Sequence, residues 1–342
     1  KDLTAAALAG ARRVHASHGS FNNEAGLPLT VLHTPPGTEV VVAEMGARFR
    51  GNIAELCEVA RPTVGVVTHI GLAHAEHLGG PEGILATKAE LVEALPATGL
   101  AVLNADDPAT PALAARTVAR VVTVGSAASA DVVIHDLALD GELRPRFDLA
   151  SPWGRLEIAL AVRGAHQAQN AAMAATVALA LDVAPDTVAR GLAGAAPAAW
   201  RMELVTSPTG VVVLNDAYNA SPTSMRAALR ALGDLPAAGR RVAVLGDMLE
   251  LGSHAEAEHA GLAQLALDAG VDVLIAVGPG AAAAATPAAD AGLEVHTVAD
   301  RDQARAVVAR HVQPGDAVLV KASRAVGLET VGDALARGES AE

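Results

Sequence analysis

Short aliphatic runs alternate with longer amphipathic stretches from about residue 38 onward. The runs are rich in β-branched residues and predict strands, whereas the stretches between them repeat apolar residues at helical spacing. The predicted strands cover residues 39–44, 63–70, 100–106 and 120–126, and the predicted helices lie near 52–60, 82–95 and 109–117. Continuous apolar strands separated by helices are typical of a parallel sheet covered on both faces. The pattern therefore predicts an α/β domain.

The stretch from 130 to 162 has a different period. Polar and apolar residues alternate there, and turn signals separate the runs. This alternation predicts an antiparallel hairpin or meander attached to the first domain. One long helix is predicted after it, over 166–183, and should end near Pro185.

A second series of alternating elements begins around Arg201 and predicts a smaller doubly wound domain. The Pro- and Ala-rich stretch 193–200 separates the two series, so we expect one domain over 1–199 and another over 200–342. The alanine-rich stretch 278–292 is expected to form a helix or a surface loop. The predicted strands of the second domain cover 210–216, 241–247, 272–278, 293–298 and 316–322, and its predicted helices lie near 221–232, 256–269 and 302–311.

Composition supports this division and limits the partners. A chain of 342 residues is long for one domain, and an aromatic content of 2% means that small aliphatic side chains must build the cores. The net charge of −13, without any basic run, argues against nucleic-acid binding.

Cysteine content and apolar runs bear on the compartment. Cys57 is the single cysteine, so neither disulfides nor a thiolate metal cluster are expected. The longest apolar runs fall short of the roughly 20 residues that cross a bilayer, and the first residues do not resemble a signal peptide. We expect a cytoplasmic protein that does not insert into membranes.

Polar side chains that directly follow apolar strands are the candidates for chemistry, because ligands bind at the carboxyl ends of parallel strands. Glu44 and His74 follow different strands and could together hold Mg²⁺ or Mn²⁺. Alternatively, Glu44 is a solvated loop residue and His74 caps a turn. His69 and His77 lie in the same segment without a defined direction. Asn104 to Asp107 follow a third predicted strand, and Asn215 and Asp216 follow a fourth.

Lys88 lies on the apolar stripe of its predicted helix. The residues three, four and seven positions later are Leu91, Val92 and Leu95, and the lysine is placed near the first turns, where the helix dipole disfavours a cation. In one alternative, the aliphatic part of the Lys88 side chain runs along the core and its ammonium group reaches water. In the other, the amine loses its charge and takes part in a reaction. The chain contains no G-x-x-x-x-G-K-[ST] loop, so the residues alone do not establish nucleotide hydrolysis.

Nine motifs in order resemble the ATP-dependent Mur ligases, over nearly the whole chain. NDAYNASP and LGDMLELG are the most specific of them. The resemblance implies a P-loop-type central ATPase domain with a mostly parallel sheet and an antiparallel subsheet, followed by a Rossmann-like domain. The motifs are GSFNNEAGLPLT (19–30), EMGAR (44–48), GLAH (71–74), KAELVEAL (88–95), LNADDP (103–108), RMELV (201–205), NDAYNASPTSM (215–225), LGDMLELG (245–252) and VKASRAVGLE (320–329).

The resemblance also implies a reaction. ATP would phosphorylate the terminal carboxylate of UDP-N-acetylmuramoyl-tripeptide, and the amine of D-alanyl-D-alanine would attack the acyl phosphate in peptidoglycan precursor synthesis. Such chemistry depends on positioning and on charge neutralisation. By resemblance, Glu44 and His74 hold Mg²⁺, and Lys88 becomes a carbamate by reaction with CO₂. A lysine with a depressed pKa supplies the neutral amine that this reaction needs.

Three further residues are implied to bind ATP. Asn170 matches an adenine-binding asparagine, although Gln167 stands where the family pattern has Asn. Arg201 matches an arginine that reaches the phosphates, and Asp216 a ribose-binding aspartate. As alternatives, Asn170 would cap a helix and Arg201 would be a surface charge on a linker.

The carboxylate and amine substrates are implied to meet other residues. Asn219, Ser323 and Arg324 correspond to the side that receives D-alanyl-D-alanine, where an arginine can bind a carboxylate with two hydrogen bonds. Asn22 and Asn23 correspond to a loop on the tripeptide side, or else form an asparagine-rich turn.

The chain opens with Lys1, Asp2 and Leu3, which resemble the helix that follows the family's phosphate-binding loop. We therefore expect a monomeric fragment that lacks the UDP-binding domain and this loop, and that does not turn over ATP alone. Two other functions stay open: a folylpolyglutamate synthase-like or secondary-metabolite ligase, and a non-catalytic relative that only binds a ligand or partner.

Overall fold

The two predicted series of strands form two separate six-stranded sheets. The structure, a computed structural model, describes residues 1–72 and 75–339. The chain divides into two units. The first contains Lys1–Ile70, His77–Leu139 and Arg144–Ala196, and the second contains Gly71–Glu76, Asp140–Leu143 and Pro197–Glu342.

The main sheet of the first unit has the strand order β3-β4-β5-β6-β7-β8. Neighbours from β3 to β6 are parallel, and β6, β7 and β8 are antiparallel, so the predicted meander continues the parallel sheet. The elements are α1 Asp2–Ala9, β1 Val14–Ala16, α2 Gly26–Leu32, β2 Val40–Val42, α3 Asn52–Ala60, β3 Val64–Val67, α4 Ala75–Leu78, α5 Gly80–Glu93, β4 Leu100–Asn104, α6 Thr110–Ala114, β5 Arg120–Gly125, β6 Val132–Leu139, β7 Pro145–Ser151, β8 Gly154–Ala159, α7 His166–Ala180 and α8 Pro185–Ala193.

One predicted strand lies outside the main sheet. Of the predicted strand 39–44, only Val40–Val42 form a strand, β2, which pairs in parallel with β1 so that Val40 lies opposite Val14. The sequence analysis did not predict β1. Its three residues are too few to show a strand period.

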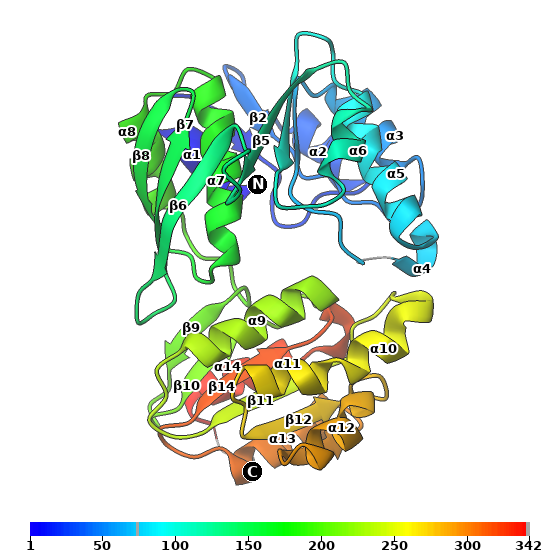
Figure 1. Ribbon diagram of the computed structural model, residues 1–342, viewed down its shortest axis with the longest axis vertical. Coiled ribbons are helices and arrows are strands. Elements are labelled where there is room, and N and C mark those ends of the chain that lie inside the picture. Colours follow the sequence, from blue (N-terminus) through cyan, green and yellow to red (C-terminus); the bar gives the residue numbers. More distant parts are fainter. Residues whose placement is uncertain (73–74, 340–342) are drawn as a thin grey trace. The chain divides into compact units, whose positions relative to one another are not determined.

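Helix α7 provides much of the first core. Ten of its fifteen residues are buried, most of them alanines, and it packs against β4, β5, β6 and β7 (Figure 1). Small residues let backbones approach closely elsewhere too: a Cβ at Gly191 on α8 would lie 2.2 Å from the carbonyl oxygen of Ala6 on α1. Phe147 on β7 is the largest side chain in this core and is 1% exposed. The core is therefore built as the low aromatic content predicts.

The sheet of the second unit has the order β13-β12-β11-β14-β10-β9. All neighbours are parallel except β9, an antiparallel edge strand that the sequence analysis missed. The elements are β9 Glu203–Thr206, β10 Val212–Asn215, α9 Pro222–Asp234, β11 Arg241–Gly246, η1 Gly252–His254, α10 Ala255–Ala260, α11 Leu262–Asp268, β12 Val273–Val277, η2 Ala281–Ala284, α12 Ala285–Asp290, β13 Glu294–Val298, α13 Arg301–His311, β14 Ala317–Lys321, η3 Arg324–Val326 and α14 Glu329–Arg337.

Helices cover both faces of this second sheet. Helices α13 and α14 contact each other and pack on one face, while α9 contacts β11, β14 and α11. Every residue of β12 and of β14 is buried, as a doubly wound sheet requires. The predicted helix 256–269 is interrupted at Gly261 into α10 and α11. Within the described residues, none of the helices has the length and apolar character needed to cross a bilayer.

Replacement of Phe147 by alanine should destabilise the first unit strongly. The ring is buried among small side chains that cannot collapse into the space, so the loss should be about 3–5 kcal/mol in the free energy of unfolding. Chemical denaturation followed by circular dichroism measures it. Phe49→Ala is the control, because Phe49 is 57% exposed and its removal should cost little. Equal losses for the two variants would contradict this account of the core.

Candidate functional site

Lys88 lies in the middle of α5 and points toward the end of β3. Its Nζ donates a hydrogen bond to the carbonyl oxygen of His69 at 2.8 Å, and the residue is partly buried. Desolvation lowers the pKa of Lys88, although the negative charge of Asp107 acts in the opposite direction. The predicted direction of the lysine is thus confirmed, but the dipole argument was wrong, because α5 begins at Gly80 and Lys88 is well past its first turn.

The ends of β3, β4 and β5 are fixed by polar side chains beside Lys88. Asp107 is buried and accepts from the backbone N–H groups of Ile70 and Ala109. Asn104 donates to the carbonyl oxygen of Thr68 at 2.9 Å. Gln169 on α7 bridges the oxygen of the Asn104 side chain, at 3.0 Å, to a carbonyl oxygen of β5. Gln169 was not singled out from the sequence, where a glutamine in a helix carries no distinctive signal.

Glu44 and Asn22 lie together at the end of β2. The Asn22 side chain donates to Glu44 Oε1 at 2.9 Å, and the Ser17 hydroxyl accepts from the Glu44 backbone N–H at 3.3 Å. A half-buried carboxylate held by an amide in this way is preorganised as an oxygen donor for a hard cation. Asn23, by contrast, accepts from the N–H of Gly26 at 2.8 Å and fixes the start of α2, as the turn alternative predicts. The predicted ligand His74 lies outside the described residues.

Asn170 and Gln167 lie one turn apart on α7 and are hydrogen bonded to each other. The Asn170 amide nitrogen donates to Gln167 Oε1 at 3.1 Å. The alternative of a helix cap is wrong, because α7 begins at His166 and Asn170 is already in its second turn. Gln167, which departs from the family pattern, thus contacts Asn170, which matches it.

Asp216 forms a buried ion pair with Lys321 at the end of β14. The distance from Lys321 Nζ to Asp216 Oδ2 is 2.6 Å, and the lysine side chain is 2% exposed. The same ammonium donates to the carbonyl oxygens of Asp216 at 3.3 Å and of Asn219 at 2.8 Å. The second oxygen of Asp216 accepts from the backbone N–H of Met202 at 3.0 Å. Sequence reasoning missed Lys321, although a lysine that ends the apolar run AVLV is a usable signal.

Two arginines lie on aromatic rings in the same unit. The Arg201 guanidinium carbon is 4.0 Å from the centre of the Tyr218 ring, and that of Arg324 is 4.6 Å from the Trp200 ring. Arg324 also pairs with Glu329 at 3.1 Å. Both arginines are exposed, so these contacts orient charges that remain accessible. The chain has a single tyrosine and two tryptophans, and it uses the tyrosine and one tryptophan here.

The other two predicted amine-side residues differ in exposure. Asn219 is exposed, and its carbonyl oxygen is held by Lys321. Ser323 is buried, and its hydroxyl accepts from the backbone N–H of Leu249 at 2.9 Å. Ser323 therefore fixes the segment that carries the LGDMLELG motif.

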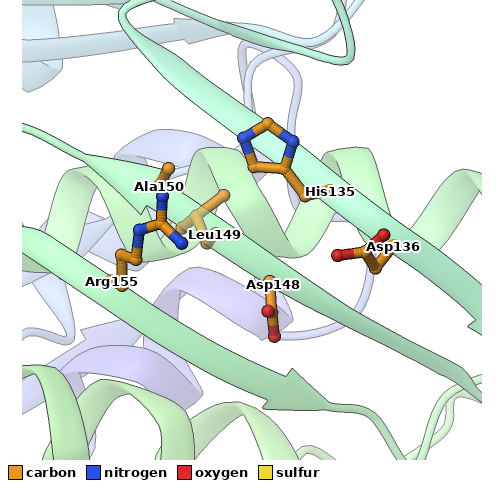
Figure 2. Close-up of a pocket in the computed structure, with 6 residues that line it drawn as sticks. All are labelled: His135, Asp136, Asp148, Leu149, Ala150 and Arg155. Atoms are coloured by element: carbon orange, nitrogen blue, oxygen red, sulfur yellow. The ribbon is translucent and has the colours of Figure 1, made fainter.

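A small hollow of about 180 Å³ lies on the open face of the antiparallel strands (Figure 2). It contains none of the predicted site residues. Alternation along β7 turns Phe147 and Leu149 inward and the polar residues outward, which explains its polar lining. It is lined by His135, Asp136, Asp148, Leu149, Ala150 and Arg155.

Comparison with known proteins agrees with this geometry. The family described as Mur ligase middle domain matches residues 1–178, and the family described as Mur ligase, glutamate ligase domain, matches residues 200–324. The UDP-N-acetylmuramoyl-tripeptide–D-alanyl-D-alanine ligase of Mycobacterium tuberculosis is 45% identical over 98% of this chain and 70% of its own length. The ligase of the same name from Bacillus subtilis is 34% identical over 97% of this chain and 72% of its length.

Solved structures give the same result. A crystal structure of MurF from Acinetobacter baumannii superposes with a TM-score of 0.88 at 27% identity, covering 98% of this chain and 73% of the other. MurF ligase from Thermotoga maritima, solved in complex with ADP, gives a TM-score of 0.84 at 28% identity, with 98% and 76% covered. Sequence, fold and the arrangement of the motif residues therefore agree that the chain belongs to the Mur ligase family.

Proposed function

We propose that this chain takes part in the ATP-dependent joining of UDP-N-acetylmuramoyl-tripeptide to D-alanyl-D-alanine, a step of peptidoglycan synthesis. The observation that carries the proposal is the 45% identity, over 98% of the chain, to a ligase named for this reaction. The division into domains 1–199 and 200–342 belongs to the same proposal.

The reaction transfers the γ-phosphoryl group of ATP to the tripeptide carboxylate, which gives an acyl phosphate and ADP. The amine of D-alanyl-D-alanine then attacks the acyl carbon. The tetrahedral intermediate loses phosphate as the amide bond forms, and the amine loses a proton. The protein has to hold oxyanions close together, so its contribution is positioning and positive charge.

Glu44 is the residue that we propose as a ligand of Mg²⁺ or Mn²⁺, together with His74 by resemblance. The chemistry of the donors fits, since a carboxylate oriented by Asn22 presents oxygen to a hard cation. The bound ion would neutralise phosphate charge. Asn22 then has two functions: it orients Glu44, and its loop faces the carboxylate substrate. The role proposed for Asn23 is weaker support, because its side-chain oxygen is used by α2.

Lys88 is proposed to carry a carbamate. Carbamate formation joins the neutral amine to CO₂ and releases a proton, so it needs an amine that deprotonates readily. Desolvation lowers the pKa of Lys88, and its partner is a neutral carbonyl group. The product is an anion that can bind the metal ion.

ATP binding is proposed for three residues. Asn170 would hydrogen bond to adenine, with Gln167 orienting the amide. Arg201 would contact phosphate, and its position on Tyr218 limits the loss of side-chain freedom on binding. Asp216 would bind ribose with the acceptor capacity that remains beside Lys321 and the N–H of Met202.

The amine substrate is proposed to bind at Arg324 and Asn219, and Ser323 supports the loop that carries the LGDMLELG motif. Arg324 has an exposed guanidinium that lies on the Trp200 ring and is thereby oriented. Such a group can bind the D-alanyl-D-alanine carboxylate with two parallel hydrogen bonds.

The acceptor assay tests the function itself. The full-length enzyme, supplied with ATP and UDP-N-acetylmuramoyl-tripeptide, should form one product, one ADP and one phosphate for each D-alanyl-D-alanine consumed. With glutamate as acceptor the rate should fall by at least about 100-fold, because the carboxylate would be misplaced. Mass spectrometry and coupled phosphate release measure both. Comparable rates with the two acceptors would refute the proposed substrate.

Arg324→Lys should weaken binding of the amine substrate selectively. A lysine cannot make the paired hydrogen bonds, and one charge-assisted bond is worth about 1.5–3 kcal/mol, so KM for D-alanyl-D-alanine should rise roughly 10- to 100-fold. KM for ATP should stay unchanged. Arg230→Lys on the exposed side of α9 is the matched control. An unchanged KM for the amine in Arg324→Lys would remove Arg324 from the substrate site.

Carbon-13 NMR of the full-length enzyme in ¹³C-labelled bicarbonate with Mg²⁺ should show one protein carbamate signal. The signal should grow as pH rises at constant dissolved CO₂, because deprotonation of Lys88 supplies the reactive amine. It should begin to appear at a lower pH than for an ordinary lysine, since the pKa is lowered.

Lys88→Arg keeps the positive charge and should abolish both the carbamate signal and the activity. The variant itself assigns the signal, and of the three lysines in this sequence Lys321 is held by Asp216. Lys1→Arg is the control and should keep the signal. Persistence of the signal in Lys88→Arg, or its absence from the wild type, would refute the carbamate.

A further inference from the structure

A cluster of one carboxylate and two imidazoles lies at the edge of the second sheet. Glu294 and His296 are two residues apart on β13 and therefore point to the same face of the strand. His311 ends α13, the helix that packs beside β13. Within residues 1–72 and 75–339, this is the one group of three such side chains whose donor atoms all lie within 4.8 Å of one another.

One carboxylate oxygen connects the three side chains. Glu294 Oε1 is 2.8 Å from Nε2 of His296 and 3.1 Å from Nδ1 of His311. The two imidazole rings have their centres 4.0 Å apart. About a quarter of the His296 side chain and a third of the His311 side chain remain exposed, so an ion can reach the cluster from water.

The surroundings orient the carboxylate. Arg240 Nη1 is 3.7 Å from Glu294 Oε2, which leaves Oε1 facing the imidazoles. The charge of Arg240 is balanced by Asp316, whose Oδ2 lies 3.0 Å from its Nη2. Outer groups that orient a ligating carboxylate are a regular feature of metal sites.

We propose that Glu294, His296 and His311 form a binding site for one borderline divalent cation of the Zn²⁺ class. Two imidazoles and one carboxylate are a common set of Zn²⁺ ligands, and water would fill the remaining position. Bonds of about 2.0–2.1 Å in tetrahedral geometry separate neighbouring donors by roughly 3.3 Å, which is close to the 2.8 Å and 3.1 Å from Glu294 Oε1 to the two imidazole nitrogens. Each imidazole would bind through the nitrogen that now faces Glu294; this nitrogen would give up its proton to water on binding, and the other nitrogen would carry the N–H.

The proposed site is independent of the ligase reaction. Glu294 and His296 lie in the amino-terminal half of β13, and β11 and β12 separate this edge strand from β14. Asp216, Asn219 and Arg324, which are proposed to bind ATP or the amine substrate, follow the carboxyl ends of β10 and β14 instead. A bound ion would tie the edge strand to the end of α13. It should therefore raise the melting temperature of the protein and leave the reaction rate unchanged.

Calorimetric titration of the tag-free, chelator-treated full-length enzyme with Zn²⁺, in excess Mg²⁺, tests the site. The wild type should bind one equivalent and melt at a higher temperature. The variant His296→Gln/His311→Gln should bind at least about tenfold more weakly and lose the thermal shift. His135→Gln makes the same change at an exposed strand position of the first unit and should bind as the wild type does.

Glu294→Gln provides a second variant that keeps size and hydrogen bonding, in case the double variant is poorly folded. It should also weaken Zn²⁺ binding at least about tenfold, because it removes the anionic ligand. Titration with Co²⁺ should give a visible absorption band in the wild type that both variants lose. Equal Zn²⁺ affinity in the wild type and in Glu294→Gln, or no binding by the wild type, would overturn the proposal.

Discussion

Strand β4 of the first sheet and strands β12 and β14 of the second are buried on both faces among small aliphatic side chains, and this constraint decides where polar groups can lie. Every position of β12 and β14 is inaccessible to water, so a charged side chain along these strands would need a partner. The strand ends are the places where such partners exist, because loops bring backbone N–H and carbonyl groups there. Asn104, Asp107 and Lys321 all occupy strand ends and bond to backbone groups. Burial of the strand interiors thus restricts the polar side chains of these strands to the strand ends and the loops that follow them.

The ion pair of Lys321 with Asp216 shows the cost and the use of this arrangement. Burying two charges costs several kcal/mol for each ion, and their attraction offsets this only when further hydrogen bonds complete the geometry. Lys321 has them: one carboxylate oxygen and two carbonyl oxygens surround its ammonium. An apolar pair of the same volume could be as stable, so stability alone does not explain the pair. What it provides is a fixed path for the segment that contains Tyr218 and Asn219, on which Arg201 rests.

Long periodic segments could be predicted from the sequence, and short ones could not. Helices α3 and α7 and the central strands of both sheets agree with their predicted ranges, because several turns or a full apolar run define them. Strand β1 has three residues and strand β9 has four, so neither is long enough to show a clear period. Each is defined by its pairing partner, which is β2 for β1 and β10 for β9. The direction of Lys88 followed from helical spacing, but its distance from the start of α5 did not, because Gly79 and Gly80 let the helix begin earlier than its apolar pattern. Asn23 and Ser323 show a further limit: their side chains accept hydrogen bonds from the backbone N–H groups of Gly26 and Leu249, and a sequence motif does not reveal such bonds.

Lys88 and Lys321 show how one residue type acquires opposite properties. Lys321 has a carboxylate oxygen of Asp216 at 2.6 Å and the carbonyl oxygen of Asn219 at 2.8 Å, so its ammonium group is held in place. Lys88 has only the carbonyl oxygen of His69 within hydrogen-bonding distance among its described contacts. The carboxylate of Asp107 is already used by two backbone N–H groups, and its charge only partly offsets desolvation. A lysine in the first environment fixes structure, and a lysine in the second has an amine that can react. In the sequence, both Lys88 and Lys321 are lysines near apolar residues. Only the position of a neighbouring carboxylate in the structure distinguishes them.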